Sequence, residues 1–431
     1  MTRETIELGE YKSVRRTAAP PSAADLRLAD QLAGREGEPR LTVRWLSSGD
    51  VDITSNSWIG VVHFSQLEIR VVPKLVGGAL RVLRMLEYAS GVDLLKRLPV
   101  DRPLPASGED LLDLICLLLA EETQVLVRDG LLRGYRSVDE PVEVLRGRLR
   151  YRDQYLRRFG QLHPLECHFD EYDSNIPENQ LLSAALTAAR GRATDPGVRS
   201  SIMRLVGLLT DSCEATTTDP TWYERAIRYD RRNARYRPAH ELSLLVLRSV
   251  AFDDIYDTSS GRVGAFLLDM NVVFEKFITR LVEDALKSTD LSVDRQSRLQ
   301  AVIRDDTAGR SYAAIRPDLV IRDSTGRSVP VDIKYKLYDT KKVAASDVYQ
   351  LFMYAYALGA HDTVRRVGLM YPAATPSVGP LLSVKPLAGP TAARITGTGL
   401  DILAALDSIA TKDVGPLYAS IRAAVGDITG D

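Results

Sequence analysis

Cysteine is scarce in this sequence of 431 residues, which contains three. Cys116, Cys167 and Cys213 form no Cys-x-x-Cys pair, and this argues against a disulfide framework and against a zinc finger. His168 follows Cys167 and His163 lies close by, but the sequence holds no second cluster of metal-ligand types. We therefore interpret these residues as structural.

Long apolar runs are also absent, because no stretch approaches the roughly 18 residues of a membrane-spanning helix. The longest, Leu111 to Ala120, is interrupted by Asp113, so it predicts a buried amphipathic helix. The first residues lack the basic-then-apolar pattern of a signal peptide. A cytoplasmic protein is therefore expected.

Neither sign of charge dominates. Lys plus Arg number 56 and Asp plus Glu number 57, for a net charge of -1, so the chain as a whole does not attract nucleic acid. Affinity for DNA must then come from local patches or from a partner. The sequence also lacks G-x-x-x-x-G-K-[ST], so nucleotide hydrolysis is not expected of this chain. Gly397-Thr398-Gly399 is too short for a phosphate loop and predicts a turn before the final helix.

Two β-branched runs, Arg316–Ile321 and Val329–Lys336, flank the polar turn Asp323–Arg327 and predict a β-hairpin. Asp318 and Asp332 are symmetric about the centre of this turn. In a symmetric register they lie opposite each other, with Cβ atoms about 5 Å apart.

Because side chains alternate along a strand, Lys334 shares a face with Asp332, while Val331, Ile333 and Tyr335 point to the other face. Carboxylates are the oxygen ligands that Mg²⁺ prefers, and a bound metal lowers the pKa of a water that attacks phosphorus. Lys334 can orient that water or stabilise the developing charge. The alternative is an edge hairpin whose solvent face merely carries charges.

Two predicted helices accompany the hairpin. The helix from Ser346 to Leu358, capped by Ser346 or Asp347, places Gln350 and Tyr354 on one face, where they can steady the lysine, touch a phosphate or simply pack. The helix from Phe266 to Leu286 carries Glu275, a candidate third metal ligand. The alternative for Glu275 is a solvated glutamate that pairs with a neighbouring Lys276 or Arg280.

This order of glutamate helix, Arg-Pro-Asp strand, Asp-x-Lys strand and Gln-x-x-x-Tyr helix resembles the PD-(D/E)xK nuclease superfamily. More narrowly, the chain resembles the McrC family, the nuclease subunits of McrBC-type modification-dependent restriction systems. Besides the nuclease box, the matching segments are Leu67–Lys74, Val82–Tyr88, Leu145–Leu149, Cys167–Tyr172 and Pro177–Gln180. Gln180 departs from the family, which has a basic residue after Asn179.

The resemblance implies a Mg²⁺-dependent DNA endonuclease subunit of an anti-phage restriction complex. Its catalytic residues would be Asp318, Asp332, Lys334, Gln350 and Tyr354, and its metal ligands Asp318, Asp332 and Glu275. The implied partners are a hexameric McrB-like AAA+ GTPase, whose GTP hydrolysis the chain would stimulate, and modified double-stranded DNA. Two alternatives stay open: a non-catalytic assembly factor that activates the GTPase, and a stand-alone repair nuclease of the same superfamily.

We predict an α+β multidomain fold with three parts. Residues 1–140 form a β-rich and helical partner-binding domain, residues 141–250 a mainly helical region, and residues 251–431 an α/β nuclease domain of the restriction-endonuclease type. The predicted strands are 41–45, 51–53, 58–62, 145–151 and 364–371, and further helices are 79–89, 110–129, 177–192, 198–209 and 400–410.

Arginines gather in two stretches. One holds Arg146, Arg148, Arg150, Arg152, Arg157 and Arg158; the other holds Arg225, Arg228, Arg231, Arg232, Arg235 and Arg237 among Trp222, Tyr223, Tyr229 and Tyr236. Arginine with aromatics can bind nucleic acid or an acidic protein surface, or it can form a solvated helix face paired with Glu224 and Asp230. Solvated faces are commoner than direct DNA contacts. We hypothesise that one stretch contributes to the interface with the GTPase.

Overall fold

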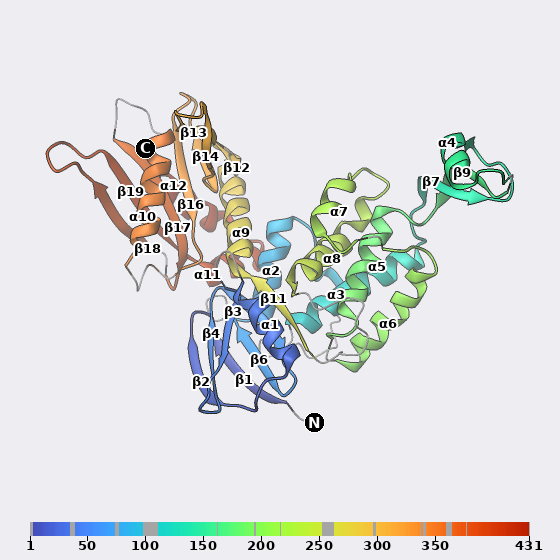
Figure 1. Cartoon of the computed structure of the whole chain (residues 1–431). Helices are drawn as coiled ribbons and strands as arrows, with labels where there is room; N and C mark the ends of the chain where they lie inside the picture. Colours follow the sequence, from blue (N-terminus) through green and yellow to red (C-terminus); the bar gives the residue numbers. More distant parts are fainter. Residues whose placement is uncertain are drawn as a thin grey trace.

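The computed structural model of the protein describes residues 3–34, 39–73, 77–97, 111–161, 163–193, 195–215, 217–251, 263–295, 299–336, 338, 342–358, 364–375 and 377–430. This described part is a mixed α/β fold with twelve α-helices and several sheets (Figure 1). None of the helices within it combines the length and the apolar character that crossing a membrane requires.

The N-terminal module consists of two small sheets and helix α1 (Ala23–Ala33), which pack around one apolar core (blue in Figure 1). Its strands are β1 (Glu4–Gly9), β2 (Ser13–Thr17), β3 (Leu41–Trp45), β4 (Asp50–Ser55), β5 (Trp58–His63) and β6 (Leu67–Val72). Strands β2, β4 and β3 form one sheet, and β1, β6 and β5 begin the other. The three strands predicted between residues 41 and 62 are confirmed, because alternating side chains face this core.

The second N-terminal sheet is completed by strands from far along the chain. Strand β11 (Gly264–Asp269) pairs antiparallel with β5 and carries β10 (Val250–Ala251) on its other edge. At Gly60 of β5 an added Cβ would lie 2.1 Å from the carbonyl oxygen of Phe266, so only glycine permits this close approach. Strands beyond the predicted boundary at residue 251 therefore belong to the N-terminal sheet.

The predicted helix from Phe266 was wrong at its start. Residues up to Asp269 are strand β11, and helix α9 (Met270–Leu286) begins where the Asp269 side chain accepts a hydrogen bond of 2.9 Å from the Asn271 amide. A short apolar run fits a buried strand and a buried helix equally, so periodicity could not separate the two.

The middle of the chain is a bundle of helices that shares a large apolar core with α9. These helices are α2 (Ala79–Ser90), α3 (Leu111–Arg128), α5 (Pro177–Ala189), α6 (Pro196–Thr210), α7 (Pro220–Ala226) and α8 (Arg237–Ser249). The four predicted helices in this region are confirmed, including the buried α3. Gln180 is buried in α5, where its amide nitrogen donates to the Asn175 side chain at 2.8 Å.

An arm projects from this bundle between α3 and α5 (Figure 1). It consists of β7 (Gly134–Val142), β8 (Arg148–Leu149), α4 (Tyr151–Arg157) and β9 (Leu165–Asp173), so its strands cross the predicted boundary at residue 140. The predicted strand 145–151 was largely wrong. Gly147 has a φ of +64°, and an added Cβ would lie 2.3 Å from the His168 carbonyl oxygen, so the chain turns sharply before β8.

The C-terminal part is a six-stranded mixed sheet of order β12-β15-β16-β17-β19-β18 between two layers of helices. Helices α9 and α12 (Gly415–Thr429) cover one face, and α10 (Ala345–Leu358) packs on the other. The strands are β12 (Ser292–Arg295), β15 (Leu319–Arg322), β16 (Ser328–Ile333), β17 (Arg365–Ala373), β18 (Ser377–Val384) and β19 (Ala393–Asp401); β13 (Leu299–Asp305) and β14 (Arg310–Ile315) form a separate hairpin.

Two predictions near the C-terminus need correction. Gly397–Gly399 lies inside β19, not in a turn, because β17 and β18 both pair with this segment. Helix α11 (Ile402–Thr411) matches the predicted helix 400–410, but α12 follows it and completes a layer against the sheet. The predicted strand 364–371 is confirmed as β17.

Candidate active site and projecting arm

The hairpin of β15 and β16 has the predicted symmetric register. Leu319 pairs with Val331, and continuing this register by one residue places Asp318 opposite Asp332. Asp318 lies just before β15 because Pro317 has no amide hydrogen to continue the ladder. Its carboxylate accepts a 2.7 Å hydrogen bond from the Ile333 amide and so takes the place of a backbone partner.

Asp332 and Lys334 form a buried ion pair beside Asp318. The Lys334 ammonium lies 3.1 Å from Oδ2 of Asp332, whose residue is 1% exposed. Val331, Ile333 and Tyr335 face the opposite side and enter the core with α9. One face of the strand therefore carries the charged groups and the other packs, as the alternation predicted.

The two aspartates perturb each other. Burial, followed by the charge of Asp332, raises the pKa of Asp318 to about 7. Burial also raises the pKa of Asp332, although the Lys334 ammonium opposes this effect. Burial alone would lower the pKa of Lys334, but the neighbouring Asp332 carboxylate outweighs it and raises that pKa. Near neutral pH, the aspartate pair therefore binds a proton that a cation could replace.

The aspartate pair suits a hard divalent cation. Oδ2 of Asp332 is buried, and the Lys334 ammonium 3.1 Å away offsets part of its charge. Mg²⁺ is commonly held by one or two carboxylates and completes its shell with water. Within the described part of the chain, no three His, Cys, Asp or Glu side chains are grouped to hold a metal ion. Glu275 is near enough to raise the pKa of Asp318, and its role as a third ligand stays a prediction.

Gln350 and Tyr354 share one face of α10, as predicted, and support the acidic strand. The Gln350 amide donates to the Tyr354 hydroxyl at 2.7 Å, and that hydroxyl donates to the Arg316 carbonyl at 3.1 Å. Arg316 is two residues before Asp318. The pair therefore fixes the backbone that presents Asp318.

Asp347 is a buried carboxylate that the sequence analysis treated only as a cap. It lies inside the first turn of α10, which begins at Ala345, and its charge raises the pKa of Asp332 further. The Lys336 ammonium lies 3.1 Å from it, and the Tyr338 hydroxyl donates to it. The signal that could have revealed it is the second lysine of Lys334-Tyr335-Lys336, which needs its own partner.

For the nuclease activity that the resemblance implies, we expect Tyr354→Phe to slow DNA cleavage by about fivefold without unfolding the protein. The change removes the hydroxyl that holds the Arg316 carbonyl, and such a bond contributes about 1 kcal/mol. Tyr349→Phe is the matched control, because Tyr349 lies on the same helix and is exposed. Cleavage rates of the two variants decide the point, and equal rates would show that the tyrosine hydroxyl has no part in positioning Asp318.

The second arginine stretch belongs to the body of the protein. Tyr223 and Tyr236 are fully buried, and the Tyr236 hydroxyl donates to Oδ1 of Asn179 at 2.9 Å. Arg232 pairs with Asp230 at 3.2 Å. The arginines of this stretch are exposed, as the alternative predicted, but the Asp230 pair lies in a turn after α7 instead of on a helix face, and Glu224 pairs with Arg248 of α8.

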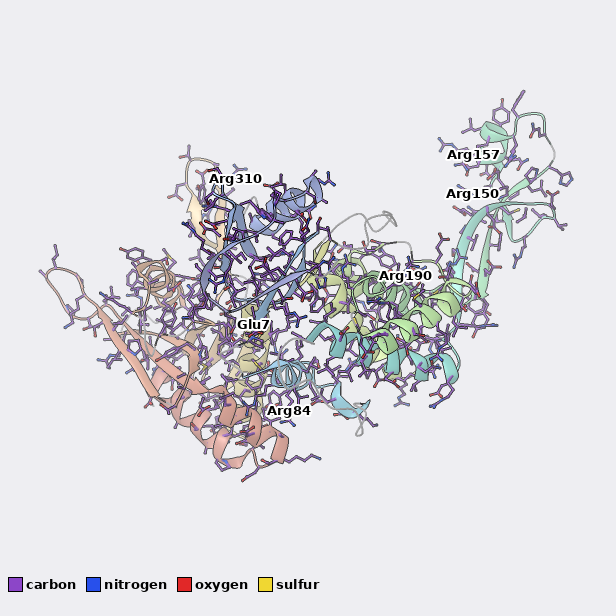
Figure 2. All side chains as sticks on the ribbon, turned by 90° about the horizontal axis from the view of Figure 1, so that it is seen from below. Glu7, Arg84, Arg150, Arg157, Arg190 and Arg310 are labelled. Carbon is purple, nitrogen blue, oxygen red and sulfur yellow. The ribbon has the colours of Figure 1, made fainter. Side chains whose placement is uncertain are left out.

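The first arginine stretch lies in the arm, among exposed apolar side chains. Eight of the 24 exposed large hydrophobic residues in the described chain lie in this arm: Tyr135, Val144, Leu145, Tyr151, Tyr155, Leu156, Phe159 and Tyr172. Arg150 and Arg157 lie on this arm in Figure 2. Cys167 packs into the small core of the arm, whereas His168 faces Asp139 at 2.7 Å, so the two point to opposite faces and hold no metal together. Two pairs of these exposed rings are in contact, Tyr135 with Tyr172 and Tyr155 with Phe159, and exposed apolar patches are typical of interaction surfaces.

Asn179 fixes the base of the arm. Its side-chain nitrogen donates to the Leu132 carbonyl at 2.9 Å and to the Ser174 carbonyl at 2.7 Å, which are the residues that flank the arm. The Tyr236 hydroxyl donates a hydrogen bond to Asn179 and accepts another, of 2.8 Å, from the Leu132 amide. Both ends of the arm are therefore fixed by one buried network of hydrogen bonds around Asn179 and Tyr236.

A family model described as McrBC 5-methylcytosine restriction system component matches residues 53–372, nearly three quarters of the chain. The chain belongs to this family. The match runs from the N-terminal sheet through the arm to the acidic hairpin and β17.

Solved structures of McrBC complexes match the chain, and the first of them shares its fold. One is a half-complex from a tetradecameric assembly of Thermococcus gammatolerans McrB AAA+ hexamers with bound McrC, with 18% identity, a TM-score of 0.59 and coverage of 98% of this chain and 100% of that one. Another is the Thermococcus gammatolerans McrBC complex, with 22% identity, a TM-score of 0.43 and coverage of 65% and 88%. No curated protein sequence matches the chain.

Proposed function

We propose that the chain is the DNA endonuclease subunit of a McrBC-type restriction complex and hydrolyses phosphodiester bonds with Mg²⁺. The observation that carries this proposal is the pair of Asp318, which is half-buried, and Asp332, which is buried, with Lys334 at their side. Two neighbouring carboxylates held largely out of water oppose folding through their repulsion and lost hydration, and such perturbed groups cluster at functional sites.

Each residue of the site has a distinct proposed role. Asp318 and Asp332 hold the metal, and bound Mg²⁺ would supply polarisation of the phosphoryl oxygen and a water of lowered pKa. Lys334 keeps its proton, because Asp332 raises its pKa, and its ammonium stabilises the negative charge that develops on the phosphate. Gln350 and Tyr354 keep the Asp318 backbone in place through Arg316. Glu275 adds negative charge beside Asp318.

We expect the Mg²⁺ requirement for cleavage to depend on pH below about 7. The pKa of Asp318 is raised to about 7 by burial and by Asp332, so the pair retains a proton as the pH falls through this value. Because a cation must displace that proton, binding weakens at lower pH and levels off above the pKa. The Mg²⁺ concentration that gives half-maximal cleavage should rise up to about tenfold between about pH 7 and pH 6. A constant Mg²⁺ requirement over this range would contradict a ligand role for the aspartate pair.

The partner we propose is a hexameric McrB-like AAA+ GTPase, and the substrate is double-stranded DNA with modified bases. The solved relative of similar fold is McrC bound to McrB AAA+ hexamers. In this chain, the arm is the candidate contact, because it carries exposed aromatics and arginines and projects away from the sheet that contains β16 (Figure 1). The neutral net charge also favours a partner that brings the DNA.

The test is cleavage of methylated and unmethylated plasmid with Mg²⁺, by the wild type and by Asp332→Ala, each with and without the GTPase and GTP. Cutting that requires the partner, GTP and Asp332 supports the proposal. If both proteins stimulate GTP hydrolysis equally and neither cuts, the chain is instead an assembly factor, an alternative that the exposed arm favours. Cutting by the chain alone would favour a stand-alone nuclease.

A further inference from the structure

The turn between β1 and β2 leaves the N-terminal module and contacts the strand that carries the acidic pair. The Tyr11 hydroxyl donates a 2.8 Å hydrogen bond to the backbone carbonyl of Tyr335. Tyr335 directly follows Lys334, so residues 324 positions apart in sequence meet one residue beyond the lysine. The contact therefore joins the N-terminal module to the backbone of the candidate site.

This turn is held in one conformation. Tyr11 has a φ of +55°, a left-handed conformation that is uncommon for a bulky residue and persists only where the surroundings impose it. The buried Ser55 hydroxyl donates to the Gly9 carbonyl at 2.7 Å and accepts from the Lys12 amide at 3.0 Å. The Tyr11 amide donates to the Asn56 carbonyl at 3.3 Å. The fold thus imposes an unfavourable backbone angle at the residue that reaches the catalytic strand.

The same turn contacts the side chain of Tyr335 as well as its backbone. That side chain is 1% exposed and packs on Phe274 of α9, with ring centroids 5.4 Å apart. Glu10, which is also buried, lies close enough that its carboxylate, after burial, raises the pKa of the Tyr335 hydroxyl. Tyr335 is therefore enclosed between the N-terminal turn and the helix that bears Glu275.

The backbone at Lys334 needs such support, because β16 ends at Ile333. The Lys334 amide still donates to the Met370 carbonyl of β17 at 2.9 Å, but the chain then bends, and the Lys336 amide donates back to the Lys334 carbonyl at 2.9 Å. Lys334 thus lies where the hydrogen-bonded part of the strand ends. The next contact along the backbone is the one from Tyr11.

We infer that Glu10 and Tyr11 are positioning residues for Lys334, and that the N-terminal module thereby sets the efficiency of cleavage at a site in which it has no catalytic group. This inference rests on the nuclease function proposed above. A lysine that must lie beside both Asp332 and a scissile phosphate depends on backbone placement, and small displacements of a catalytic group greatly reduce turnover. The turn can do this without touching DNA or metal.

The test is Tyr11→Phe, which removes the donating hydroxyl and keeps the ring, with Lys12→Ala as the control in the same turn. In the complex with the GTPase, we expect kcat for DNA cleavage to fall about fivefold to tenfold. The KM for DNA and the stimulation of GTP hydrolysis should stay at wild-type values, and the midpoint of thermal unfolding should fall by no more than a few degrees. Hydrogen exchange at the amides of Lys334 and Lys336 should become faster in Tyr11→Phe and not in Lys12→Ala. Glu10→Gln should repeat the effect more weakly.

Two outcomes would overturn the inference: unchanged kcat with unchanged exchange, or an equal loss of cleavage, GTPase stimulation and thermal stability, which indicates general damage to the fold. If the wild type cuts no DNA, the proposed function fails, and with it the catalytic meaning of the contact. Exchange at Lys334 and Lys336 then still decides whether the turn holds the strand.

Discussion

Asp332→Asn should abolish DNA cleavage while the complex with the GTPase still assembles. The change keeps the shape of the side chain and removes the charge of a carboxylate that is 1% exposed and that we propose as a metal ligand. A catalytic metal contributes several kcal/mol, and each tenfold in rate corresponds to about 1.36 kcal/mol, so a loss of about 10³-fold or more is expected.

Folding should survive this substitution. The charge that Asp332 loses no longer raises the pKa of Asp318, so Asp318 ionises more readily and offsets the Lys334 ammonium in its place. The midpoint of thermal unfolding should therefore stay within a few degrees of the wild type. Asp323→Asn is the matched control, because Asp323 lies in the turn of the same hairpin and accepts hydrogen bonds that asparagine can also accept. Retained cutting by Asp332→Asn, with the control as active as the wild type, would mean that the nuclease site lies elsewhere.

Removal of the arm should abolish stimulation of the GTPase and leave the nuclease fold intact. Asn179 binds the carbonyls of Leu132 and Ser174 with one nitrogen, so the two ends of the arm lie close enough for a short Gly-Ser linker in place of residues 134–173. The small core of the arm, Val138, Cys167 and Phe169, is separate from the large core of the body. GTP hydrolysis by the partner and size-exclusion chromatography of the mixture measure the result.

A less drastic variant keeps the arm and removes only exposed side chains, so it tests whether the surface of the arm is needed for binding. The double change Tyr155→Ala and Phe159→Ala removes two exposed rings that contact each other, with centroids 5.2 Å apart. If they are central to the interface, binding to the GTPase should weaken by about 30-fold, as for a hot spot of roughly 2 kcal/mol. Met203→Ala with Leu208→Ala is the control, because these exposed residues lie on helix α6 of the body. Equal binding by both double variants would exclude this part of the arm from the interface.

The sequence predicted the acidic hairpin well because its determinants are local. The turn Asp323–Arg327 fixes the register, the register fixes which residues oppose each other, and alternation then places Lys334 beside Asp332. The helix with Gln350 and Tyr354 was also predicted, but its hydrogen bond to Arg316 was not. That contact joins residues 38 positions apart, and spacing within one helix contains no information about it.

The errors arose where distant segments decide the local structure. Strand β11 forms because β5 offers a free edge, while its own sequence, Gly264–Asp269, suits a helix nearly as well. The two long strands of the arm, β7 and β9, were not predicted, because each is paired with the other across 22 intervening residues and neither pattern contains information about its partner. Asp347 was treated as a cap because its partners, Lys336 and Tyr338, lie 11 and 9 positions earlier in the sequence and outside the helix.

The pairing of β11 with β5 also limits how this protein can be divided. A fragment that begins at residue 251 would carry β11 with an edge of unpaired amides and carbonyls, and the remaining N-terminal piece would expose the matching edge of β5. Phe266 and Leu267, which are buried in the whole chain, would face water in such a fragment. Separately produced halves should therefore aggregate or recombine with each other, and mixing them is a direct way to ask whether a cut chain can rebuild the sheet and, with it, the acidic site.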